Sequence, residues 1–143
     1  MLIKNIRHTG IVVQNLKKTL NFFTKELGFK VIKKQLEKGQ FIEKILKLKK
    51  VKVTTVKLAA NDGSLIELLK FHNYSKKEIK KRIFSFGITH VSFTVSNIQK
   101  LVKVLKKNKI EILSDPATSP NKKVKVVFCK FSDSIFFEFV EEL

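Results

Sequence analysis

The stretch that decides the fold is His8-Thr9-Gly10-Ile11-Val12-Val13-Gln14-Asn15-Leu16, because its plan recurs 82 positions later. The second copy reads His90-Val91-Ser92-Phe93-Thr94-Val95-Ser96-Asn97-Ile98. A histidine opens each copy, a valine stands five residues later, and an asparagine follows two residues after the valine. A fixed offset shared by several residue types seldom arises from composition alone, so the sequence predicts an internal duplication.

The offset changes toward the end of each half. It becomes 71, which carries Asp62 to Asp133 and Glu67 to Glu138. The fall from 82 to 71 means that 11 residues are inserted in the first half, where residues 36–50 have no counterpart. We therefore expect a single domain, residues 1–143, made of module 1 (3–71) and module 2 (85–141), which a polar linker (72–84) joins.

Charge and composition exclude several classes of protein. The formal net charge is +18, yet 28 of the 30 basic residues are lysines spread along the chain. Sequence-specific readers of nucleic acid depend on the arginine fork, so we expect no nucleic-acid partner. Instead, a lysine-rich surface attracts small anionic substrates.

The chain shows no sign of export or of a membrane segment. It contains no apolar run approaching the roughly 18 residues of a membrane span, and the N-terminus lacks the apolar segment of a signal peptide. The single cysteine, Cys129, cannot form an internal disulfide and lies in an apolar stretch. We therefore expect a cytoplasmic protein with no membrane partner, in which Cys129 is inert core.

Local patterns predict the same order of elements in both halves. Asn15 and Asn97 are suited to cap amphipathic helices, and Gly28 is suited to end the first one. Alternating apolar residues and turn signals predict strands at 3–13, 29–35, 51–60 and 64–71, and at 86–95, 111–113, 124–131 and 135–141. The expected fold is α+β, with two tandem βαβββ modules.

Strand alternation predicts that four chemically useful side chains point away from the helix-packed face of their sheets. His8 shares its face with Ile6 and Gly10, whereas Ile11 and Val13 point the other way, toward the helix. His90 repeats this arrangement in module 2. Glu67 and Glu138 each stand between large apolar neighbours that point to the opposite face, and a glutamate in so apolar a strand needs a partner.

The duplication joins these side chains into one hypothesis. Two histidines and two glutamates supply nitrogen and oxygen ligands suited to Zn²⁺, Ni²⁺, Co²⁺, Mn²⁺ or Fe²⁺. Because both residue types recur at equivalent places, we predict that His8, Glu67, His90 and Glu138 bind one divalent metal ion. The alternative is that they are polar positions left over from such a site.

The chain resembles the vicinal oxygen chelate superfamily, which includes glyoxalase I and methylmalonyl-CoA epimerase. The resemblance covers essentially the whole chain and is carried by the two opening stretches, by Glu26-Leu27-Gly28-Phe29, by Asp62-Gly63-Ser64-Leu65-Ile66-Glu67-Leu68 and by Phe136-Phe137-Glu138. It implies curved mixed sheets that form a metal-containing cleft, usually in a homodimer. The His/Glu/His/Glu set is similar to that of bacterial glyoxalase I.

The resemblance also implies a chemistry. Proteins of the glyoxalase I type are lyases or isomerases that move a proton α to a carbonyl through a metal-stabilised enediolate, as lactoylglutathione lyase does. Glu138 would be the base, with Glu67 as the second candidate, while His8 and His90 would hold the metal as neutral imidazoles. The substrate would be a small anionic compound, a hemithioacetal or a thioester.

Several alternatives stay open. This sequence departs from the glyoxalase I pattern at Leu68-Leu69-Lys70-Phe71 and at Ser132-Asp133-Ser134, so the substrate is not fixed. An acyl-CoA epimerase would need a second base, for which Glu43 is available. An extradiol dioxygenase would use Fe²⁺ and an open facial triad, against which the fourth ligand argues. A non-enzymatic protein similar to the bleomycin-resistance branch would bind a small molecule without metal.

Three further features complete the expectations. Phe41, Ile45 and Leu48 share one helical stripe of the insertion, which predicts a lid, a dimer contact or core packing. Three lysines after Pro120 could grip a substrate carboxylate or could simply be solvated loop charge; they are Lys122, Lys123 and Lys125. The remaining histidine, His72, is expected at the surface.

Overall fold

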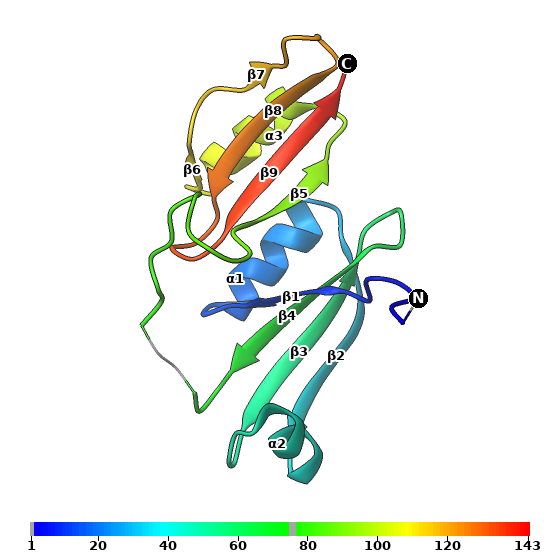
Figure 1. Cartoon of the computed structure of the whole chain (residues 1–143), viewed down its shortest axis with the longest axis vertical. Coiled ribbons are helices and arrows are strands. Elements are labelled where there is room, and N and C mark those ends of the chain that lie inside the picture. Colours follow the sequence, from blue (N-terminus) through cyan, green and yellow to red (C-terminus); the bar gives the residue numbers. More distant parts are fainter. Residues whose placement is uncertain (1, 75–76) are drawn as a thin grey trace. The chain divides into compact units, whose positions relative to one another are not determined.

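The computed structural model describes residues 2–74 and 77–143 (Figure 1). The chain divides into two compact units, residues 1–76 and 77–143, and each is built on its own mixed sheet. This arrangement confirms the predicted α+β class. The predicted linker, residues 72–84, lies partly outside the described residues.

The first unit has a four-stranded sheet in the order β1-β4-β3-β2. Strand β1 runs parallel to β4, whereas β4 with β3 and β3 with β2 pair antiparallel. Its elements are β1 (Thr9–Val12), α1 (Leu16–Asn21), the π-helical turn η1 (Phe22–Glu26), β2 (Lys30–Lys38), α2 (Gln40–Leu46), β3 (Lys52–Ala59) and β4 (Leu65–Phe71).

The second unit repeats this topology. Its sheet has the order β5-β9-β8-β6, and β5 runs parallel to β9 as β1 does to β4. Its elements are β5 (His90–Thr94), α3 (Ile98–Lys107), β6 (Glu111–Ile112), β7 (Ala117–Thr118), β8 (Val124–Lys130) and β9 (Phe136–Glu142). The short strand β7, which pairs with β8, was not expected from the sequence.

Both predicted helix caps are confirmed. The side chain of Asn15 accepts a hydrogen bond from the Lys18 amide at 2.9 Å, and Asn97 accepts one from the Lys100 amide at 2.8 Å. Helix α3 buries one apolar stripe and lies along one face of its sheet (Figure 1). Gly28 has φ +78°, a left-handed conformation that suits a glycine at a helix end.

The first strand of each unit is shorter than predicted. Strand β1 begins at Thr9 rather than Ile3, and the side chains of Ile3 and Ile6 are 73% and 88% exposed. The reason is that β1 pairs with β4, which itself begins only at Leu65, so earlier residues have no strand beside them. For the same reason β5 begins at His90, opposite the first residue of β9, rather than at Phe86.

The insertion extends strand β2 and adds helix α2 near one end of β2 and β3 (Figure 1). Of the alternatives predicted for Phe41, Ile45 and Leu48, core packing is wrong for Phe41 and Ile45, which are exposed; a lid or a dimer contact stays a prediction. The buried residue is Ile42, which belongs to a cluster with Val51 and Val53. Leu48 packs against that cluster, so the insertion contributes to the core of the first unit.

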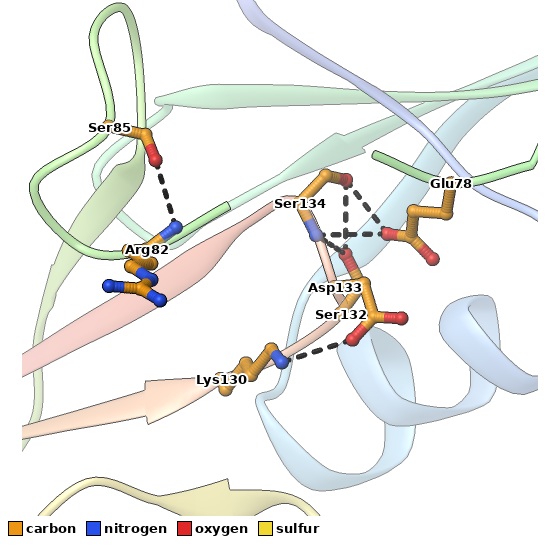
Figure 2. A network of polar contacts seen from close by, with 7 residues as sticks. All are labelled: Glu78, Arg82, Ser85, Lys130, Ser132, Asp133 and Ser134. Atoms are coloured by element: carbon orange, nitrogen blue, oxygen red, sulfur yellow. Dashed lines mark hydrogen bonds and ion pairs between the residues drawn. The ribbon is translucent and has the colours of Figure 1, made fainter. Parts of the chain in front are cut away.

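A polar network fixes the turn that leads into strand β9 (Figure 2). A carboxylate oxygen of Glu78 accepts hydrogen bonds from the Ser134 hydroxyl at 2.8 Å and from its amide at 3.1 Å. Lys130 pairs with Asp133 at 3.0 Å, and its hydrogen bond holds the pKa of that carboxyl below its usual value. The network ties the start of the second unit to the turn from which Glu138 is positioned.

Among the described residues, no helix combines the length and the apolar character needed to cross a membrane.

Candidate functional site

In the first unit, His8 and Glu67 lie against each other. His8 immediately precedes β1, and Glu67 stands in the middle of β4, opposite Gly10. The Nε2 atom of His8 is 3.3 Å from a carboxylate oxygen of Glu67, and the two side chains are 30% and 13% exposed. Because His8 and Gly10 are two positions apart, the imidazole and the carboxylate share one face of the sheet.

In the second unit, His90 and Glu138 repeat this arrangement. His90 is the first residue of β5, and Glu138 on β9 lies opposite Ser92. The Nε2 atom of His90 is 3.9 Å from a carboxylate oxygen of Glu138, with side chains 41% and 23% exposed.

The two pairs have the same register. In each unit the glutamate lies opposite the residue two positions after the histidine, namely Gly10 in one unit and Ser92 in the other. Parallel pairing of the first and last strands brings residues distant in sequence together on one face. The duplication seen in the sequence is therefore a duplication of local geometry as well.

The glutamates are the exception in their strands. On the opposite face, Ile66 and Leu68 flank Glu67 and are 5% and 0% exposed, while Phe137 and Phe139 flank Glu138 and are almost fully buried. A carboxylate in such a strand is costly unless a partner compensates for lost water. In each unit that partner is a histidine.

His8 carries an unsatisfied atom. Within the described part of the chain, its Nδ1 is buried and has no hydrogen-bond partner, whereas its Nε2 faces Glu67. The imidazole thus directs its one partnered nitrogen toward the shared face of β1 and β4.

A third side chain joins the first pair but has no counterpart in the second. Lys57 on β3 lies opposite Glu67, and its Nζ is 3.8 Å from the second carboxylate oxygen of Glu67. At the matching place in the second unit, Phe128 lies opposite Glu138 and packs edge-on against the His90 ring at 5.4 Å. Sequence reasoning missed Lys57, because one lysine among 28 carries no signal by itself; the offset of 71 between positions 57 and 128 could have found it.

The other predicted residues are placed as follows. Cys129 is buried, and burial raises the pKa of its thiol to about 12, which fits an inert core residue. His72 is exposed, as predicted, and its Nε2 is 2.8 Å from the Thr54 hydroxyl. Glu43 lies in the first turn of α2, half-buried.

The three candidate lysines lie around the start of β8 in the second unit. Lys122 and Lys123 are exposed in the turn before the strand, and Lys125 is half-buried within it. The structure gives none of them a place beside His90 or Glu138.

Each unit supplies two of the four predicted ligands. Within residues 2–74 and 77–143, no cluster of three or more His, Cys, Asp or Glu side chains forms a ready metal site. The binding of one ion by all four residues stays a prediction.

Comparisons with known proteins agree with this architecture. The chain is 30% identical over 126 residues to YurT of Bacillus subtilis, an uncharacterized protein, with 88% of each chain covered. A glyoxalase family protein from Bacillus cereus superposes with a TM-score of 0.88 at 23% identity, over 100% of this chain and 99% of that one. A glyoxalase I variant from Zea mays superposes with a TM-score of 0.64 at 20% identity, over 95% of this chain and 47% of that one.

At these identities the two structures show the fold alone. The profile of one superfamily, however, matches residues 5–137, which span both His/Glu pairs apart from Glu138 itself. The chain belongs to the Glyoxalase/Bleomycin resistance protein/Dioxygenase superfamily.

Proposed function

We propose that the protein is a divalent-metal-dependent enzyme of the glyoxalase I type, which takes the proton α to a carbonyl group and returns it to the adjacent carbon. The observation that carries this proposal is the repetition of one His/Glu pair, in one register, on both sheets. A single pair could be a chance surface contact. Two pairs in identical register indicate a shared task.

The donor atoms suit a metal ion. Bonds of about 2.0–2.2 Å from an ion to a histidine nitrogen and a carboxylate oxygen leave neighbouring donors about 3.0–3.5 Å apart. The His8–Glu67 separation of 3.3 Å lies in that range, and the His90–Glu138 separation of 3.9 Å needs only a small side-chain movement. His8, Glu67, His90 and Glu138 would hold the ion, with Zn²⁺, Ni²⁺, Co²⁺, Mn²⁺ and Fe²⁺ as candidates.

When bound, a divalent ion supplies Lewis acidity that stabilises negative charge developing on the substrate carbonyl oxygen. The protein must supply the base. We assign that role to Glu138, because within the described residues its carboxylate pairs with His90 alone, at 3.9 Å. Glu67 is held from two sides, by His8 and Lys57, and is less exposed. Glu138 is therefore freer to take a proton from one carbon and return it to the next.

The surroundings favour a charged substrate. The formal net charge of +18 attracts anions from a distance and speeds their encounter with the protein. The expected substrates are anionic carbonyl compounds presented as hemithioacetals or thioesters, and the expected assembly is a homodimer.

The first experiment measures the metal content of protein purified without added metal, by mass spectrometry. Wild type should hold about one divalent ion per four-residue site, and a His90→Ala/Glu138→Ala variant should lose it. The matched control is His72→Ala/Glu142→Ala, which removes the same residue types from exposed positions.

Hemithioacetal isomerisation and acyl-CoA epimerisation assays on the loaded protein then separate the two enzyme types. If wild type binds no ion after incubation with Ni²⁺, Zn²⁺, Mn²⁺ and Fe²⁺, the proposed enzyme is refuted. The metal-independent binding protein would take its place.

A further inference from the structure

We infer that Lys57 is a substrate-binding residue that selects a substrate with an anionic group close to the reacting carbonyl. The inference rests on the proposed function, and it deepens that function by naming the substrate class. The supporting observation is a difference in charge between two equivalent positions, one in each of the duplicated sheets.

The two rows are equivalent position by position. The first contains Gly10, Glu67 and Lys57 on β1, β4 and β3, and the second contains Ser92, Glu138 and Phe128 on β5, β9 and β8. Residues paired directly across strands point to the same face. Lys57 therefore lies on the face of the candidate ligands, where the duplicated position holds an aromatic ring.

Lys57 is not a freely solvated surface lysine. Its side chain is 28% exposed, so most of its aliphatic stem is covered while the ammonium group still reaches solvent. Among the described residues, the ion-pair partner of Lys57 is Glu67, at 3.8 Å. That separation exceeds hydrogen-bond length, so the ammonium group keeps its three N–H donors for another acceptor.

Binding of an ion changes the charge balance around Lys57. A divalent ion balances the two carboxylates, and neutral imidazoles add nothing, so the ammonium of Lys57 is left without a counter-ion. A second lysine makes the excess larger, because Lys33 on β2 lies directly opposite Lys57. Like charges placed directly opposite destabilise a sheet. An anionic group on the substrate would relieve this excess.

The short distance between Lys57 and Glu67 limits the substrate. An anion bound by Nζ lies beside a carboxylate that holds the ion, so it is separated from the reacting carbonyl by only a few bonds. Short carboxylates with a neighbouring carbonyl or hydroxyl fit this description. A substrate whose charges are all remote from the carbonyl does not.

The test uses Zn²⁺-loaded protein and two probes of nearly equal shape, lactate and its uncharged counterpart lactamide. Isothermal titration calorimetry gives the dissociation constant of each probe and, separately, that of Zn²⁺. Lys57→Met removes the charge but keeps most of the side chain, and Lys57→Arg restores the charge. Lys34→Met is the matched control, because Lys34 on the neighbouring strand β2 lies opposite Val56 and therefore points to the other face of the sheet.

We expect Lys57→Met to weaken lactate binding about tenfold, the effect of losing one charge-assisted hydrogen bond, and to leave lactamide binding unchanged. Zn²⁺ should bind at least as tightly as in wild type, because a positive charge beside the ion has been removed. Lys57→Arg should recover most of the lactate affinity, and Lys34→Met should match wild type.

The possible failures are distinguishable. If Lys57→Met weakens lactate and lactamide equally, or weakens Zn²⁺ binding as well, Lys57 only supports the sheet and the inference is wrong while the metal site stands. If wild type prefers lactamide or shows no preference, the substrate class is wrong. If wild type binds no Zn²⁺, both the proposed function and this inference are overturned.

Discussion

The ion pair between Lys57 and Glu67 makes the two glutamates unequal in the metal-free protein, and this inequality can be measured. At 3.8 Å, Coulomb's law gives about 1 kcal/mol in bulk water and about 4 kcal/mol at an effective dielectric constant of 20. Both side chains are partly covered, so desolvation offsets much of the larger figure, and we expect a net coupling of about 1 kcal/mol. His90 is 41% exposed, so its pair with Glu138 contributes about 0.5 kcal/mol or less.

The perturbations are Glu67→Gln, Glu138→Gln and Lys57→Met, with the Lys57→Met/Glu67→Gln double variant closing a cycle. Urea unfolding of chelator-treated protein, followed by circular dichroism, gives each free energy of unfolding. Glu67→Gln should cost about 1 kcal/mol more than Glu138→Gln, or about 3 °C in Tm for a chain of 143 residues. A coupling energy near zero in the cycle, or equal costs for the two Gln variants, would refute the reasoning.

Three further predictions concern the framework of the site. Burial raises the pKa of the Cys129 thiol from 9.0 to about 12, so above pH 9.0 the unfolded chain loses this proton while the folded chain keeps it. The free energy of unfolding should therefore fall as pH rises, by at most about 1.4 kcal/mol per pH unit. Urea titrations of wild type and Cys129→Ala at several pH values measure this contribution as the difference between their slopes. Asn97→Ala should cost about 1 kcal/mol in the same unfolding assay, since it removes the cap of α3. Gly28→Ala should lower Tm because φ is +78°, whereas Gly10→Ala should have a smaller effect, since its new Cβ would meet Leu69 Cδ1 at an ordinary 3.5 Å; equal losses would contradict the role of the left-handed backbone.

The sequence predicts the repeated topology well, because duplication, caps and turns are local signals. It predicts strand ends poorly, because these depend on the neighbour. Ile3 and Ile6 look like strand residues, yet β4 does not extend far enough to pair with them. Strand β2 is longer than predicted because it is an edge strand rich in charged residues, which hides the apolar alternation.

The candidate site divides in the same way. The offsets identify His8, Glu67, His90 and Glu138, and the structure joins them as two pairs. The role of Lys57 depends on register, which no local pattern gives. The offset of 71 aligns position 57 with Phe128, but the contact between Lys57 and Glu67 is seen only when β3 is placed beside β4.

Because the first and last strands of each unit pair in parallel, each His/Glu contact forms only when its unit has folded. His8 and Glu67 are 59 residues apart in sequence, and His90 and Glu138 are 48 apart. Contacts between residues so far apart in sequence form late in folding, because the chain must first lose the entropy of closing the long loop between them. Neither half of the site exists in a partly folded unit. Under the proposed function, an incompletely folded chain would therefore lack the ligands needed to bind a metal ion.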